Sequence, residues 1–257
     1  MIDNIKFGIK INTDEFHLLT EIYENQDIID FIEVLIPPEF TREDLTIIRG
    51  FKLPYSIHFP HLKENIDFGN SKKAAYNQKF IEKVNALKKT FDQLRPFCYI
   101  VHPESGNLEM SVENIRQLQV KPLAIENMPY KFSSGGNRLA HVPETIRPYF
   151  EKMPDIEFCL DLNHAVKTAI SESLDYIELI KSFMELKKPI HFHIADGDLN
   201  SEYDDHLAIG EGNYDISALK NILYEFGSVV QLTFETPRIN KDNIGDDLKN
   251  MEAFIES

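Results

Sequence analysis

Nine side chains that can bind metal ions or move protons stand at the ends of short apolar runs along this chain. Five are histidines and four are carboxylates: His58, His102, Glu126, Asp161, His164, His193, Asp204, His206 and Glu235. Imidazole and carboxylate ligands together suit Zn²⁺, Mn²⁺, Fe²⁺ or Co²⁺ better than Ca²⁺. The pattern therefore indicates a site for divalent metal ions.

Each of these residues has a simpler interpretation when it is taken alone. A single histidine at a strand end is most often a hydrogen-bonding residue, and a single carboxylate there commonly caps a helix or solubilises a loop. Taken together, nine such residues would have to gather by coincidence. Carboxylates that gather would also repel one another and raise their pKa values unless cations neutralised them. A metal site is the favoured interpretation.

The elements that must position these residues are eight short runs rich in β-branched and aromatic residues. The runs cover residues 6–11, 30–36, 54–59, 97–102, 122–127, 157–162, 189–195 and 229–235. Helical patterns lie between them, most clearly at 71–94, 172–186 and 215–227. Strands that alternate with helices pair in parallel through right-handed crossovers. Eight units in 257 residues, about 32 residues each, predict a single (β/α)₈ TIM-barrel domain over residues 1–257.

A barrel of this class gathers its functional side chains at the C-terminal ends of its strands. The third to eighth predicted strands end at or near the nine residues named above. His191 is one strand period from His193, so we expect a packed residue or one that supports a ligand. Glu33, on the second strand, is either a substrate contact or an exposed residue.

Composition and charge narrow the class of partner. The net charge is −15, from 42 acidic and 27 basic residues, which disfavours a protein that grips nucleic-acid phosphates. The N-terminus has no run of signal-peptide length, and no stretch reaches the roughly 18 apolar residues of a membrane span. Cys98 and Cys159 lie inside apolar runs, as expected of buried free thiols in a reducing compartment. We expect a cytoplasmic protein; the sequence carries no indication of its oligomeric state.

Seven segments resemble the xylose-isomerase-like barrel superfamily, which includes endonuclease IV and the sugar-phosphate isomerases and epimerases. They run in order between residues 53 and 237: SIHFPH, IVHPESG, AIENMP, CLDLNHA, HFHIADGD, DDHLAIGEG and FETP. The most specific pieces are D-x-x-H at 161–164, H-x-x-D at 193–196 and D-x-H-x-x-I-G-E-G at 204–212.

The resemblance implies ligand roles for all nine residues. It implies that His58 and His102 bind one ion and that Glu126 bridges this ion to a second. The second ion is implied to take Asp161, His193 and Glu235, and a third ion His164, Asp204 and His206. The isomerase and epimerase branch is similar but needs only Glu126, Asp161, His193 and Glu235 around one ion. One to three divalent ions, Zn²⁺ or Mn²⁺, are therefore expected.

Several features depart from endonuclease IV. Residues 8–12 read GIKIN where the family has an H-V-S-type opening, the chain has no tryptophan, and no arginine-rich loop follows the first strand. His61 stands where the DNA-repair members carry an intercalating tyrosine. The loop at 133–141, with Arg138, is either a cradle for an anionic group or a flexible connector. His17 and His141 are expected at the surface.

Two activities fit these observations. The leading one is a metal-dependent isomerase or epimerase of a small sugar or sugar phosphate, in which an ion stabilises an enediolate and Glu126 and Glu235 move the proton. The alternative is a trinuclear hydrolase of the endonuclease IV type, acting on a phosphodiester or on a smaller ester or amide. DNA is the less favoured substrate. A non-catalytic metal scaffold is disfavoured because structural metal sites are closed, whereas a barrel mouth is open.

Overall fold

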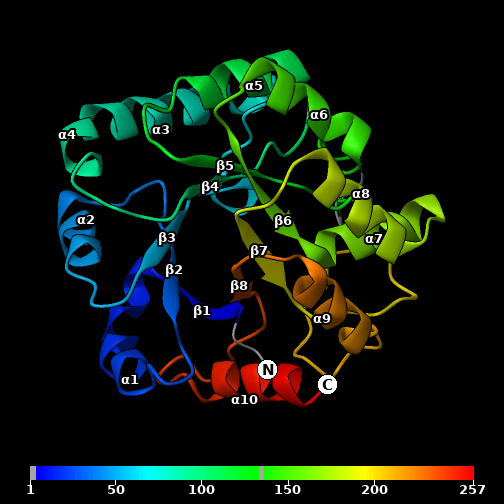
Figure 1. Ribbon diagram of the computed structural model, residues 1–257. Helices are drawn as coiled ribbons and strands as arrows, with labels where there is room; N and C mark the ends of the chain where they lie inside the picture. The colour runs from blue at the N-terminus through cyan, green and yellow to red at the C-terminus, as the bar shows by residue number, and fades with distance from the viewer. Residues whose placement is uncertain (1–3, 133–135) are drawn as a thin grey trace.

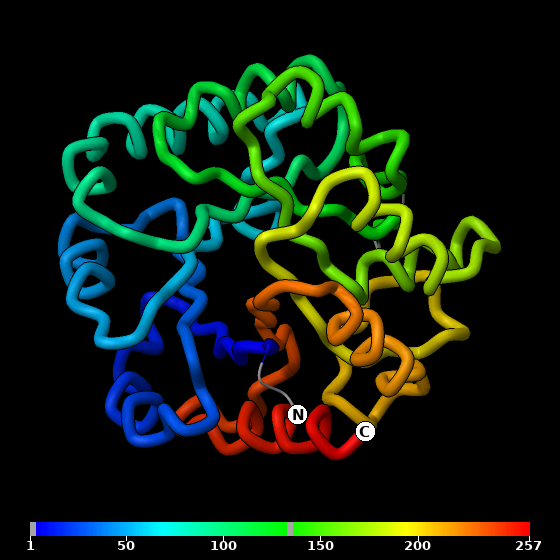
Figure 2. Tube along the Cα trace, viewed as in Figure 1, coloured from blue at the N-terminus to red at the C-terminus, as the bar shows by residue number. Residues whose placement is uncertain are grey.

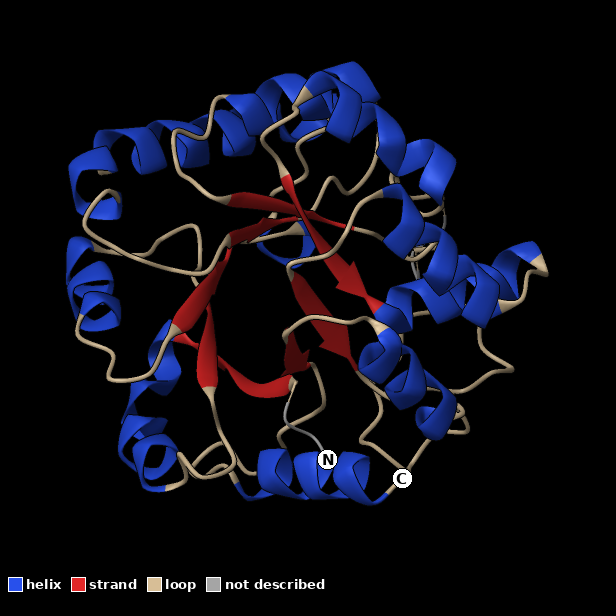
Figure 3. Ribbon diagram, viewed as in Figure 1, coloured by secondary structure: helices blue, strands red, loops and turns tan. Residues whose placement is uncertain are grey.

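The computed structural model describes residues 4–132 and 136–257, which form one closed barrel of eight parallel strands. The strands are β1 (Ile5–Asn12), β2 (Phe31–Leu35), β3 (Tyr55–His58), β4 (Tyr99–Val101), β5 (Leu123–Glu126), β6 (Glu157–Asp161), β7 (His191–Ile194) and β8 (Val230–Phe234). Each strand pairs with the next along the chain, and β1 closes the barrel against β8. The expected TIM barrel is confirmed, and all eight predicted strands are present. Figure 3 shows the strands at the centre of the molecule.

The helices surround the strands as an outer layer (Figure 1). They are α1 (Leu19–Glu24), α2 (Arg42–Arg49), α3 (Ala74–Ala86), α4 (Lys88–Phe91), α5 (Leu108–Arg116), α6 (Pro143–Lys152), α7 (Leu162–Glu172), α8 (Tyr176–Leu186), α9 (Ile216–Glu225) and α10 (Gly245–Glu256). The chain travels once around the barrel, which brings its last helix beside its first strand (Figure 2). Strands between this layer and the barrel interior are buried on both faces, which explains their continuous apolar runs.

The long helix predicted at 71–94 is divided in the structure. A short 3₁₀ turn leads into α3, and Leu87 leaves the helical conformation before α4 begins. The break allows Phe80 and Phe91 to pack edge-on against the same ring, that of Phe40, with centroids 6.3 and 5.7 Å away. Tertiary packing of aromatic side chains has overridden a continuous helical pattern here.

The strand ends carry the predicted site residues to one end of the barrel. His58, Glu126 and Asp161 are the last residues of their strands, while His102 and Glu235 directly follow β4 and β8.

The structure also bears on the two cysteines and on the presence of membrane-spanning helices. Cys98 and Cys159 are buried and unpaired, as expected. Within the described residues, no helix is both long enough and apolar enough to cross a membrane.

Candidate metal centre at the barrel mouth

The nine predicted residues form one connected group at the barrel mouth. A cavity of about 360 Å³ opens there. Six of the nine line it: His58, His102, His164, Asp204, His206 and Glu235. The other three, Glu126, Asp161 and His193, are buried directly beneath and contact members of the first group.

Glu126 lies at the centre of this group. Its Oε2 is 3.0 Å from His102 Nε2, 3.4 Å from His58 Nε2 and 3.4 Å from His193 Nδ1. Its Oε1 is 3.2 Å from His164 Nδ1. Imidazole groups therefore surround both oxygens of this carboxylate.

Three of the five histidines have one ring nitrogen held by a backbone carbonyl. In each, the Nδ1–H group donates to a backbone carbonyl oxygen. The pairs are His58 to Phe59 (2.8 Å), His164 to Asn127 (2.8 Å) and His206 to Glu235 (2.9 Å). In the neutral ring, these bonds fix the tautomer that leaves Nε2 with its lone pair free. A free Nε2 is the form that binds a metal ion.

The other two histidines are held by buried carboxylates. His102 Nδ1 is 3.1 Å from Glu104 Oε1, and His193 Nε2 is 2.9 Å from Glu33 Oε2. The opposite nitrogen of each ring faces Glu126. A carboxylate behind a histidine orients the ring and increases its basicity, which is a common arrangement around metal sites.

Glu33 is buried, so the interpretation as an exposed residue is wrong. Its Oε2 accepts hydrogen bonds from Thr233 Oγ1 (3.0 Å) and from His191 Nε2 (2.8 Å). His191 is buried beneath His193, as expected of a packed residue. The β1–β2 register places Lys10 directly beside Glu33, and this pairing explains how a carboxylate is accommodated in the barrel interior.

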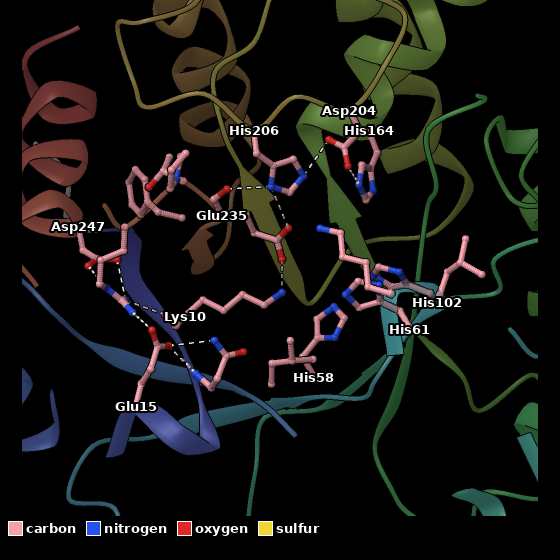
Figure 4. Close-up of a pocket in the computed structure, with 18 of the residues that line it drawn as sticks. Lys10, Glu15, His58, His61, His102, His164, Asp204, His206, Glu235 and Asp247 are labelled. Atoms are coloured by element: carbon pink, nitrogen blue, oxygen red, sulfur yellow. Dashed lines mark hydrogen bonds and ion pairs between the residues drawn. The ribbon is translucent and has the colours of Figure 1, made fainter. Parts of the chain in front are cut away.

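Lys10 is a residue of the site that the sequence analysis missed. Its Nζ lies 3.0 Å from Glu33 Oε1 and also contacts Glu235 Oε1. Figure 4 shows the side chain crossing the floor of the cavity toward Glu235. Burial opposes the charged form of Lys10, but the charges of Glu235 and Glu33 outweigh it and raise its pKa. The feature of the sequence that could have indicated it is a lysine between Ile9 and Ile11 on an otherwise apolar strand.

A fixed loop carries Asp204 and His206 to the mouth. The Asp196 carboxylate accepts hydrogen bonds from the backbone N–H groups of Gly210 (2.9 Å) and Gly212 (3.1 Å). A Cβ at Gly212 would lie 2.4 Å from the backbone carbonyl oxygen of Gly197, so only glycine fits. The loop holds His206 Nε2 at 2.8 Å from Asp204 Oδ1.

His61 and Arg138 also line the mouth. The ring of His61 stacks on that of His102, with centroids 4.9 Å apart. Arg138 is held at 3.1 Å from Glu104 and over the ring of Phe132. Residues 133–135 of the loop proposed to cradle an anion lie outside the described residues. Of the two histidines expected at the surface, His17 is exposed and His141 is half-buried.

Most carboxylates of the site do not show the raised pKa values expected of a crowded acidic cluster. Burial raises the pKa of Asp161. At Glu126 burial also favours a higher pKa, but the charges of His102 and His193 outweigh it and lower the pKa. Lys10 and His193 lower the pKa of Glu235 in the same way. At Glu126 and Glu235, imidazolium and ammonium groups supply the neutralising positive charge without which the pKa values were expected to rise.

The donor set and its spacing fit divalent ions. Tetrahedral bonds of 2.0–2.1 Å place two ligand atoms on the same ion about 3.4 Å apart. His58 Nε2 and Glu126 Oε2 are 3.4 Å apart, and His193 Nδ1 and Glu235 Oε1 are 3.2 Å apart. Among the described residues, His58 Nε2, His193 Nδ1 and Glu126 Oε1 are buried without a hydrogen-bond partner. Such atoms need partners, and metal ions bound at the mouth would provide them.

Two histidines of the site are expected to make the stability of the metal-free protein depend on pH. Burial lowers the pKa of His102 and of His206, but Glu126 and Asp204 respectively outweigh it and raise both values to about 9. A pKa raised by folding adds stability that is complete below the unfolded value, near 6.5, and is lost as pH rises through the folded value. We expect the Tm of the metal-free protein to fall between pH 6.5 and pH 9.

The affinity for metal should change in the opposite direction, because an ion binds only the neutral imidazole. Zn²⁺ titrations and thermal unfolding at both pH values check the two trends together. A metal-free Tm that rises over this range would contradict the assignment of charged imidazoles.

Comparisons with known proteins agree with this architecture. Endonuclease IV from Thermus thermophilus superposes with a TM-score of 0.73 and 17% sequence identity, covering 98% of this chain and 99% of that one. The 3-keto-D-glucoside 4-epimerase YcjR from E. coli gives 0.67 and 12%, covering 98% of each chain. The IOLI protein, solved with a zinc atom, gives 0.62 and 16%, covering 96% and 94%. At these identities, the likeness shows a shared fold.

The family assignment rests on the sequence itself. Residues 41–254 match the family model for the xylose isomerase-like TIM barrel, which is most of the chain. This match confirms the resemblance carried by the strand-end motifs. The chain belongs to the xylose isomerase-like TIM barrel family.

Proposed function

We propose that this protein is a metal-dependent isomerase or epimerase of a small sugar-like substrate. The observation that carries the proposal is the group around His193 Nδ1, which lies 3.2 Å from Glu235, 3.4 Å from Glu126 and 3.9 Å from Asp161. These four residues would hold one Zn²⁺ or Mn²⁺ ion. The likeness to an epimerase supports this class of reaction.

A bound ion would polarise the carbonyl and hydroxyl oxygens of a sugar and stabilise the charge of an enediolate. Glu235 is the better placed of the two proposed proton carriers, because it lines the cavity while Glu126 is buried beneath it. Lys10 contacts the Glu235 carboxylate and keeps it deprotonated, which is the form that a metal ligand or a general base requires. Glu126 then acts mainly as a ligand that organises the histidines around it.

The cavity size also favours a small substrate. About 360 Å³ lies at the lower end of the range for small-molecule sites, roughly 300–1,000 Å³. His61, at the position of an intercalating residue in the DNA-repair members, is stacked against His102. Its side chain is only 17% exposed, so it is poorly placed to enter a base stack.

A trinuclear hydrolase is the second candidate, and a specific observation favours it. His164, Asp204 and His206 form a further group with metal-ligand spacing. His58, His102 and Glu126 form another. A single-ion isomerase needs neither group, whereas three ions could generate hydroxide and stabilise a leaving oxygen. The substrate of such an enzyme would be a phosphodiester or a smaller ester or amide.

A substrate comparison separates the two candidates. We expect the metal-loaded protein to interconvert a member of a panel of ketoses, aldoses and their phosphates, with exchange of a carbon-bound proton for solvent deuterium detected by NMR. Abasic duplex DNA should be neither bound nor nicked at physiological salt, because a chain of charge −15 offers few phosphate contacts. Efficient metal-dependent nicking of abasic duplex, without proton exchange on any sugar, would replace the first proposal with the second.

A further inference from the structure

Glu104 adopts a backbone conformation that glutamate rarely takes. Its φ is +54°, in the left-handed region that only glycine adopts without strain. It follows His102 and Pro103 in the loop after β4, and its side chain is buried. A position that served only to turn the chain would be better filled by glycine. Strain of this kind persists where the side chain has a task.

The Glu104 carboxylate joins three loops of the mouth. Oε1 lies 3.1 Å from His102 Nδ1, just after β4, and accepts the backbone N–H of Leu62, after β3, at 3.2 Å. Oε2 accepts from Arg138 Nη1, after β5, at 3.1 Å. The strained φ places one carboxylate where all three donors converge.

The same place could be mistaken for another metal site, because His61, His102 and Glu104 have metal-ligand spacing. Arg138 argues against a cation there, since its guanidinium already lies against the carboxylate. The Glu104 carboxylate, itself held by Arg138, therefore faces the Nδ1 side of His102.

We propose that Glu104 is a positioning residue for the metal centre, which fixes the ring of His102 so that Nε2 faces Glu126 and the ion. The proposal rests on the proposed metal site and adds a residue that would not touch the ion. His58, His164 and His206 are held by backbone carbonyls, which no substitution removes. His102 depends instead on a side chain, so its support can be tested by mutation.

Two variants test the proposal. Glu104→Gln keeps the shape of the side chain but removes its charge. One accepting oxygen is replaced by an NH₂ group, which cannot accept a hydrogen bond from the donors around it. Glu104→Gly relieves the backbone strain and removes the support entirely. Glu109→Gln, the same change at an exposed position five residues away, is the matched control. The full chain is freed of metal and titrated with Co²⁺ against a competing chelator, and the visible Co²⁺ spectrum reports ligand geometry.

We expect Glu104→Gln and Glu104→Gly to raise the Co²⁺ dissociation constant of the first-filled sites by about 10- to 100-fold. Their visible spectra should change, while Glu109→Gln behaves as wild type. Wild-type affinity and an unaltered spectrum in Glu104→Gln would overturn the proposal. The proposal would also be overturned if Glu104→Gln bound Co²⁺ more weakly with an unchanged spectrum and its metal-free form had a correspondingly lower Tm. A wild-type protein that binds no Co²⁺ would instead contradict the proposed metal site itself.

Discussion

The Glu126→Gln variant is expected to bind divalent metal at least about 100-fold more weakly than the wild-type protein and to lose essentially all turnover. Glu126 contacts His58, His102, His164 and His193 through its two oxygens. An amide is nearly isosteric, but it lacks the charge and cannot offer two equivalent oxygens to neighbouring ions. No other carboxylate of the site is placed among four imidazoles.

Isothermal titration with Zn²⁺ and elemental analysis after gel filtration measure this effect. Glu151→Gln, an exposed residue of α6, is the matched control and should bind metal as the wild type does. Circular dichroism separates loss of ligand from loss of fold. Undiminished metal content in folded Glu126→Gln would remove Glu126 from the centre of the site.

The second large effect is expected from Glu235→Gln, which should lower kcat by about 10²- to 10⁴-fold while the fold stays intact. The Glu235 carboxylate contacts Lys10 and lines the cavity, where in the proposed reaction it would accept a proton from the substrate. The glutamine amide cannot accept that proton. Because Glu235 is also a proposed ligand, metal affinity should fall too, but less than in Glu126→Gln.

Steady-state kinetics at saturating metal distinguish these two contributions. A kcat that stays low when the variant is fully loaded supports proton transfer by Glu235. If added metal restores wild-type kcat, Glu235 is a ligand only and the proton carrier must be sought elsewhere. Wild-type turnover on the true substrate would contradict both roles.

The fold and the gathering of the predicted residues could be foreseen for a common physical reason. Barrel strands are buried on both faces, so each appears in sequence as a short apolar run, as at 157–162. Parallel pairing then brings the ends of all strands to one mouth. The positions of His58, Glu126 and Asp161 could be predicted once the ends of their strands were located.

The supporting residues could not be foreseen, because their partners lie far away in the sequence. Lys10 meets Glu33 through the β1–β2 register and Glu235 through closure of the barrel. Glu104 was inside a recognised motif, yet a left-handed glutamate contradicts ordinary backbone preference. The break at Leu87 likewise depends on aromatic packing against Phe40, which a helical pattern does not contain.

Anomalous diffraction from crystals loaded with Zn²⁺ or Mn²⁺ tests the central claim, that the mouth of this barrel is a metal centre. We expect a peak within about 2.0–2.2 Å of ligand atoms from Glu126, Asp161, His193 and Glu235. Further peaks beside His58 and His102, and between His164, Asp204 and His206, would indicate the trinuclear arrangement. A map without any peak at the mouth, from crystals grown at saturating metal, would contradict the account.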